Sequence, residues 1–103
     1  MDGKQIAETI IQQMGGYGKI KAMVGGHTFV YDKDGSLSFH FKGSRKANIC
    51  RVVYNVGSDT YTFQLYKFSK TTAKCPKIYE LADVYFDMLI DLFERQTGLY
   101  LSL

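Results

Sequence analysis

The chain has 103 residues, with 13 Lys and Arg against 10 Asp and Glu, and a net charge of +3. Two cysteines are too few for a disulfide framework, and a single proline argues against a disordered chain. No apolar run approaches the roughly 20 residues of a membrane span, which argues against a membrane partner. We therefore expect residues 1–103 to form a single domain with its own core, in the reducing cytoplasm, since no basic and apolar leader opens the chain.

A helix is expected first, over residues 4–14, because apolar residues recur there at steps of three to four. Gly15 and Gly16 then end it, as glycines do after many helices. From residue 18 apolar and polar residues alternate, which predicts strands joined by short turns rich in Gly and Asp. The expected strands span residues 19–24, 27–32, 36–42, 49–56 and 60–68.

A longer helix is expected over residues 76–98, because acidic residues there recur at steps of three and four. On a helix these acids share one narrow stripe, and the rest of the circumference is mostly apolar. Pro76 suits the first turn of a helix, where its missing N–H would be unpaired anyway. We expect this helix to be sunk in the core, with only the acidic stripe in water: Glu80, Asp83, Asp87, Asp91 and Glu94.

The order of these elements predicts an α+β domain. It has an N-terminal helix, an antiparallel meander of about five strands, and a long C-terminal helix packed on one face of the sheet. Both helices should cover the same face and leave the other face more open. Beyond Gly98 the tail alternates again, with Leu99, Leu101 and Leu103 as its apolar row.

The charges are unevenly distributed along the chain. Residues 1–77 hold 12 Lys and Arg against 5 Asp and Glu, whereas residues 78–103 hold 1 against 5. If the acidic helix lies on one face of the sheet, its carboxylates point away from the basic remainder. Such a layout presents a basic surface to a nucleic acid or to an acidic protein.

A family likeness is carried by five segments read in order: QQMGG, KIKAMVGGHTF, LSFHFKG, ICRVVYNVGSDTYTFQLYKF and LFERQTGLYLSL. The chain resembles a family of small uncharacterised proteins associated with bacterial phages, prophages and other mobile elements. The specific marks are Gly15-Gly16, Ala22-Met23, Asn55, residues 59–61 and residues 97–100, together with a basic Arg-Lys loop at residues 45–46. The resemblance implies a mobile-element context and a small α+β fold, and it brings no assigned activity and no catalytic residues.

Basic residues gather around the expected strands and form the candidate nucleic-acid site: Lys42, Arg45, Lys46, Arg51, Lys67 and Lys70, with Lys74 and Lys77 beyond. Tyr54, Tyr66 and Phe68 lie among them in the sequence. Single-stranded nucleic acids need both features, because phosphates attract cations and bases stack on aromatic rings. The alternative is a solvated basic face whose aromatic residues belong to the core.

Cys75 is the one candidate for nucleophilic chemistry. At the start of the expected helix, between Lys74 and Lys77, its thiolate form would be favoured. A nucleophilic enzyme also needs a base and a group that orients it, and His27 and His40 belong to no recognisable motif. We therefore expect no enzyme, and we interpret Cys50 as a small core residue.

No metal or cofactor is expected. Asp32, Asp34 and Gly35 match only the beginning of a calcium loop, and a hairpin turn explains them. His27 and His40 fall on neighbouring expected strands, but two histidines without a third ligand make a poor metal site.

Self-association is the remaining hypothesis. The wide apolar arc of the expected helix and the Leu-rich tail exceed what one small sheet covers, and exposed patches of that kind mark interfaces, most commonly in two-fold homodimers. The alternative is that the tail folds back as an edge strand or under the N-terminal helix. The sequence thus predicts a non-enzymatic binding module whose partner is a nucleic acid or, alternatively, a protein or a second copy of the chain.

Overall fold

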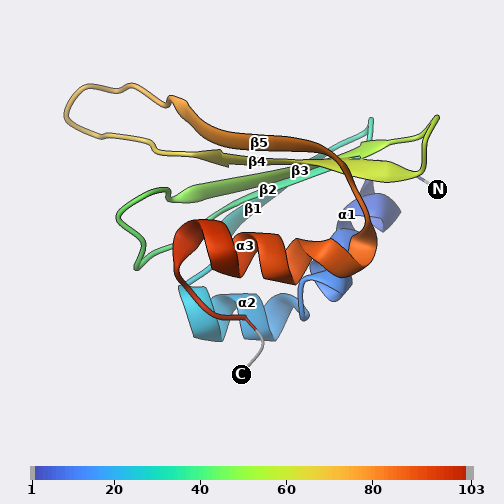
Figure 1. Ribbon diagram of the computed structural model, residues 1–103, viewed down its shortest axis with the longest axis horizontal. Helices are drawn as coiled ribbons and strands as arrows, with labels where there is room; N and C mark the ends of the chain where they lie inside the picture. Colours follow the sequence, from blue (N-terminus) through green and yellow to red (C-terminus); the bar gives the residue numbers. More distant parts are fainter. Residues whose placement is uncertain (1, 102–103) are drawn as a thin grey trace.

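A computed structural model describes residues 2–101 as five strands with helices on one side (Figure 1). Two helices come first, α1 (Gly3–Gln13) and α2 (Tyr17–Val24). Five strands follow in chain order: β1 (His27–Asp32), β2 (Ser36–His40), β3 (Ile49–Asn55), β4 (Thr60–Tyr66) and β5 (Lys77–Val84). A 3-10 helix, η1 (Phe86–Met88), leads into the last helix, α3 (Leu89–Thr97).

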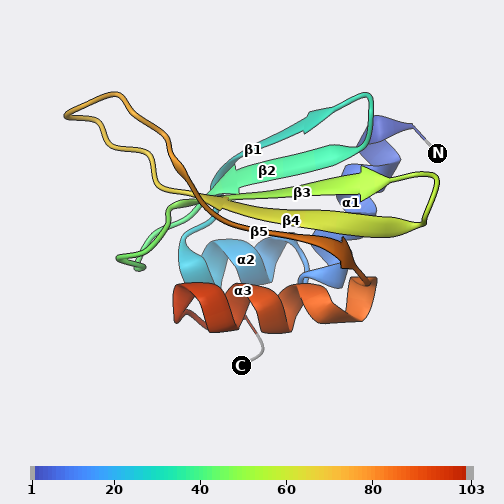
Figure 2. The same ribbon diagram turned by 45° about the horizontal axis from the view of Figure 1, so that its top comes forward.

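The sheet is an antiparallel meander with the strand order β1-β2-β3-β4-β5. All three α-helices lie on the same face of this sheet, and the other face is open (Figures 1 and 2). The predicted α+β class, the N-terminal helix, the meander and a C-terminal helix on one sheet face are confirmed. None of the helices in the described part of the chain has the length and apolar character needed to cross a membrane.

Local sequence explains the first helix. Asp2 caps α1 by accepting a hydrogen bond from the Gln5 backbone N–H at 2.8 Å, and the Gln5 side chain accepts in return from the Asp2 N–H at 3.3 Å. Such a reciprocal pair satisfies two donors that have no partner inside the helix. Ile6 and Ile10, four residues apart, then bury the same side of α1 in the core.

The core lies between the helices and the covered face of the sheet. Alternate strand residues point into it, as predicted for Leu37 and Phe39 on β2. Phe63 on β4 is also completely buried. Phe39 and Phe41 both approach Phe93 of α3, with ring centroids 6.3 and 5.0 Å apart. Packing of aromatic rings therefore joins the sheet to its last helix.

The expected strand over residues 19–24 is wrong, because this segment forms α2. Ile20, Ala22 and Val24 alternate as a strand would, but Ile20 and Val24 also stand four residues apart and are both buried, whereas Ala22 is exposed. Gly25 closes the helix in the left-handed conformation, with φ 64°. A glycine in that position ends many helices, so the glycines on both sides decide between the two patterns.

The expected helix over residues 76–98 is wrong in its first half, whereas its second half contains η1 and α3. Its first half is β5, whose residues pair with β4 at Leu65↔Tyr79 and Phe63↔Leu81. Pro76 therefore precedes a strand, and Glu80 and Asp83 lie on that strand instead of extending an acidic stripe along a helix. Without β5, the buried strand β4 would be a bare edge, so tertiary pairing overrides the helical spacing of the acids. Only the second half is sunk in the core, where Leu89 and Phe93 are fully buried, whereas Ile78, Tyr85 and Phe86 are exposed.

Both edge strands contain a bulge. The register shifts between His27 and Val30 on β1, and on β5 between the partners of Tyr61 and Phe63 and again between those of Leu65 and Tyr66. Thr28 and Asp83, at the first two of these places, adopt positive φ angles of 54° and 57°. The bulge at Asp83 sends the chain off the sheet toward η1 and α3.

The predicted alternating tail is not a strand in its described part, residues 99–101. Leu101 is fully buried, and its backbone N–H donates to Glu94 Oε2 at 2.8 Å. A Cβ on Gly15, just after α1, would lie 3.8 Å from the Leu101 carbonyl oxygen, so the tail returns to the end of the first helix. Leu103, the last residue of the predicted apolar row, lies outside the described residues.

Candidate nucleic-acid interface

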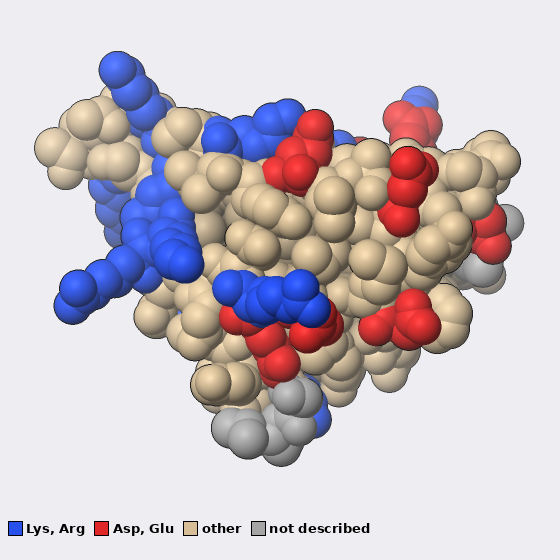
Figure 3. Space-filling view, in the orientation of Figure 1, with Lys and Arg blue, Asp and Glu red and all other residues tan. Residues whose placement is uncertain are grey.

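Two connections between strands carry most of the predicted site. The basic loop, residues 41–48, joins β2 to β3, and the basic arm, residues 67–76, joins β4 to β5. In an antiparallel meander these two connections leave the same end of the sheet, and Figure 3 shows Lys and Arg gathered there without Asp or Glu. We call their six cations the basic end: Lys42, Arg45, Lys46, Lys67, Lys70 and Lys74.

The basic loop is fastened to the ends of two helices and is braced by a hydrogen bond within the loop. The backbone N–H of Lys42 donates to the Val24 carbonyl at the end of α2, at 2.8 Å. The Ser44 hydroxyl donates to the Thr97 carbonyl at the end of α3, at 2.9 Å, and accepts from the Lys46 N–H at 3.2 Å. These anchors fix the backbone while the side chains of Lys42, Arg45 and Lys46 extend into solvent.

Asn48 ties the basic loop to the basic arm. Its side-chain amide donates to the Phe68 carbonyl oxygen at 2.9 Å, and its side-chain oxygen accepts from the Phe68 N–H at 2.8 Å. The backbone N–H of Asn48 also donates to the Tyr66 carbonyl at 2.9 Å. One side chain thus continues the β3–β4 ladder by one step beyond the strands, which holds the two cation-bearing connections side by side.

The basic arm projects from the sheet as a narrow hairpin (Figure 2). Two backbone hydrogen bonds cross it, from the Lys67 N–H to the Pro76 carbonyl at 3.1 Å and from the Ser69 N–H to the Lys74 carbonyl at 2.9 Å. Residues 70–76 are all exposed. Within residues 2–101, none of the six cations of the basic end forms an ion pair.

Arg51 does not join the basic end. It stands in the middle of β3 on the open face, and its guanidinium lies 3.6 Å from the carboxylate of Asp32. The Ser36 hydroxyl donates to the same oxygen of Asp32, Oδ2, and this hydrogen bond, more than Arg51, holds the pKa of Asp32 below its ordinary value. Lys77 is likewise paired, with Glu80 at 2.9 Å. Of the predicted set, the free cations come from the connections alone.

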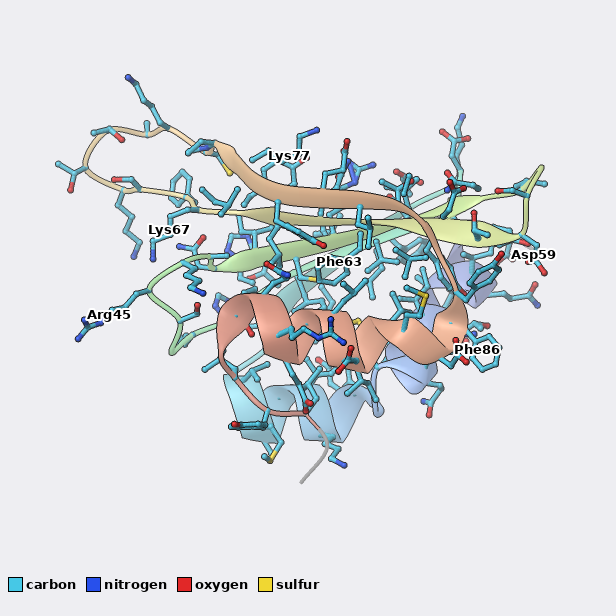
Figure 4. All side chains as sticks on the ribbon, viewed as in Figure 1. Arg45, Asp59, Phe63, Lys67, Lys77 and Phe86 are labelled. Atoms are coloured by element: carbon cyan, nitrogen blue, oxygen red, sulfur yellow. The ribbon has the colours of Figure 1, made fainter. Side chains whose placement is uncertain are left out.

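The aromatic residues predicted beside the cations divide in the same way. Tyr66 ends β4 next to the basic arm, in a cross-strand row with His40 and Lys77, and it is half-buried like Phe68. Tyr54 lies elsewhere, because its hydroxyl donates to Asp59 at 2.5 Å at the far end of the sheet. Figure 4 shows that separation, with Arg45 and Lys67 at one end and Asp59 at the other.

His27 and His40 are neighbours, as their strands suggested. They are cross-strand partners with ring centroids 5.4 Å apart, in the row nearest the basic end. Burial and, second, the neighbouring His27 ring lower the pKa of His40. Among residues 2–101, no group of three or more His, Cys, Asp or Glu side chains is placed to hold a metal ion.

The two cysteines have different surroundings. Cys75 is exposed in the basic arm and precedes a strand, so the helix N-terminus that was expected to favour its thiolate is not present there. Cys50 is completely buried, as predicted, and burial raises the pKa of its thiol.

The negative charge gathers away from the basic end, but along the molecule instead of across its layers. The other two hairpin turns, β1–β2 and β3–β4, contain Asp34 and Asp59. Glu8 of α1 and Asp87 of η1 line a groove at the same end. We call these four residues the acidic end. Four of the ten Asp and Glu residues are therefore opposite the basic end, together with Lys33 of the β1–β2 turn, so the separation of charge is partial.

Comparison with protein-family models, with curated proteins and with solved structures finds no match to this chain. The likeness to mobile-element proteins accordingly stays a prediction.

Asn48 and the groove were missed by the sequence analysis. A polar residue directly before an alternating strand is a signal for the first, whereas the second is formed by segments about 80 residues apart and leaves no local signal.

Proposed function

We propose that this protein is a non-enzymatic module that binds nucleic acid through its basic end. The observation that carries the proposal is the pair of anchored connections with six exposed or half-exposed cations and no carboxylate. Phosphate groups are attracted to such a surface, and each contact releases condensed counterions. Unlike a surface of alternating charges, this end gives a phosphate backbone no repulsive neighbour.

A single strand fits this end better than a duplex. Tyr66 and Phe68 are half-buried rings beside Lys67, and bases of a single strand stack on aromatic rings with little regard to sequence. A duplex keeps its bases stacked on one another, so these rings add nothing to duplex binding.

Fluorescence anisotropy of short labelled single-stranded and duplex DNA and RNA tests the proposal, at low salt and again near physiological salt. The double variant Arg45→Ala with Lys46→Ala should bind about tenfold more weakly, because two phosphate contacts are lost. The matched control is Lys4→Ala with Lys33→Ala, which removes the same charge far from the basic end. Asp87→Ala should not weaken binding. The proposal is abandoned if wild type does not bind at low salt, or if the Arg45 and Lys46 variant binds as wild type does.

A further inference from the structure

A groove opens at the acidic end, between the first helix and the start of the last one. Its volume is about 940 Å³, and its walls are Gln5, Glu8 and Gln12 from α1 and Phe86, Asp87 and Ile90 from η1 and α3. A smaller hollow of about 330 Å³ continues from Phe86 past Tyr85 to Asp59 in the β3–β4 turn. Figure 4 shows Phe86 and Asp59 together at the end opposite Arg45 and Lys67.

The groove combines apolar surface with negative charge. Phe86 and Tyr85 leave 61% and 57% of their surface in water, although rings of this size are usually covered in a folded protein. The charged residues that line the groove and hollow are Glu8, Asp59 and Asp87, with no Lys or Arg among the lining residues. Exposed aromatic surface beside charge of one sign is typical of a protein-binding site for a partner of opposite charge.

The chain itself carries a segment of complementary charge and shape. The basic arm projects beyond the sheet, has lysines at positions 67, 70 and 74, and contains no acidic residue. Residues 70–76, which form its tip and lead back to the sheet, are all exposed. Arm and groove stand at opposite ends of a molecule whose longest extent is 37 Å, so an arm cannot reach the groove of its own chain.

We propose that the occupant of the groove is the basic arm of a second copy of this chain. Lys70 and Lys74 of one copy lie near Glu8, Asp59 and Asp87 of the next, and the aliphatic parts of the lysine side chains cover Phe86 and Tyr85. The contact joins two different surfaces, so each copy keeps one free arm or one free groove. Such head-to-tail contacts continue into a ring or a filament, unlike a two-fold dimer.

The experiment uses two complementary variants of the full chain, studied alone and mixed. The groove variant has Glu8→Lys with Asp87→Lys, and the arm variant has Lys70→Glu with Lys74→Glu. All four positions are exposed, so circular dichroism and thermal unfolding should match wild type. At low salt, light scattering should show a wild-type mass that grows with concentration and returns to the monomer at high salt, whereas each variant alone should stay monomeric.

The mixture gives the decisive result. The arm variant has an intact groove and the groove variant has an intact arm, and the reversed arm and reversed groove also carry opposite charges. Both contacts are therefore complementary in an equimolar mixture, which should regain the concentration-dependent association of wild type. A mixture that stays monomeric, a wild type that stays monomeric at every concentration, or a single variant that associates as wild type does would overturn the proposal. The groove variant retains every cation of the basic end, so its nucleic-acid binding is measured independently.

Discussion

The basic end and the acidic end of this molecule belong to the same sheet, yet they differ in charge and in relief. At the basic end the chain projects, and anchored loops carry cations into water. At the acidic end the surface is hollowed into a groove between α1 and the segment η1–α3. The difference follows from topology, because alternate connections of a meander fall at opposite ends. The β2–β3 and β4–β5 connections hold the cations, whereas Asp34 and Asp59 occupy the turns between β1 and β2 and between β3 and β4. Strongly basic connections that alternate with neutral or acidic turns along the chain therefore gather their cations at one end in space.

The strongest way to break this contrast without changing any charge is Asn48→Ala. The substitution leaves the N–H and the carbonyl of Phe68 without their partners, so we expect the free energy of unfolding to fall by about 2 kcal/mol. Nucleic-acid affinity should fall as well, because the basic loop and arm separate. Urea unfolding measures the first effect, and fluorescence anisotropy with labelled single strands measures the second.

The matched control is Asn55→Ala, whose side-chain amide donates to the Thr62 hydroxyl at 3.1 Å nearer the acidic end. It should lower stability by about 1 kcal/mol or less and leave nucleic-acid binding unchanged. Equal affinities for the Asn48 variant and wild type would show that the hydrogen bonds between Asn48 and Phe68 do not organise the basic end.

The salt dependence of binding sharpens the contrast between the ends. For a single strand, each phosphate contact contributes about 0.7 to the slope of log affinity against log salt. We expect Arg45→Ala with Lys46→Ala to reduce that slope by about 1.4, whereas Glu8→Gln with Asp87→Asn should preserve it. An unchanged slope in the Arg45 and Lys46 variant would mean that phosphates bind elsewhere.

The smallest expected effect concerns His40, in the strand row nearest the basic end. Because its folded pKa lies below the ordinary 6.5, the unfolded chain takes up a proton first as the pH falls. The stability that the neutral His40 ring confers is therefore fully present above about pH 6.5, and it is lost as the pH falls from there through the folded pKa. In His27→Gln the repulsion from the second ring is removed, so the pKa of His40 should rise but stay lowered by burial. Titration followed by NMR measures it, and an unchanged pKa would contradict the role given to His27.

Much of the fold could be predicted from local pattern. Alternation identified β1 to β4, and the glycines after Met14 marked the end of α1. The two errors are segments that satisfy two periods at once. Residues 19–24 alternate but also repeat every four, and residues 76–84 combine helically spaced acids with apolar residues that pair across to β4. For residues 76–84, only pairing with β4 decides between helix and strand. That pairing depends on tertiary structure, so the local sequence does not reveal it.

The candidate site was predictable in its chemistry more than in its assembly. Charge alone identified Lys42, Arg45, Lys46, Lys67 and Lys70, because cations in turns seldom find partners. The sequence could not separate them from Arg51, whose pairing with Asp32 depends on the register of β1, β2 and β3. Nor could it place Tyr54, which lies in the expected group along the chain but at the opposite end of the folded strand.

The bulges of β1 and β5 have a consequence for how copies of this chain can meet. An unbroken edge strand offers a row of N–H and C=O groups on which a foreign strand can align, and this is the route by which sheets polymerise into amyloid-like fibres. Thr28 and Asp83 each interrupt that row with a left-handed residue inside the strand. Lateral growth of the sheet by edge-to-edge pairing is thereby discouraged on both sides.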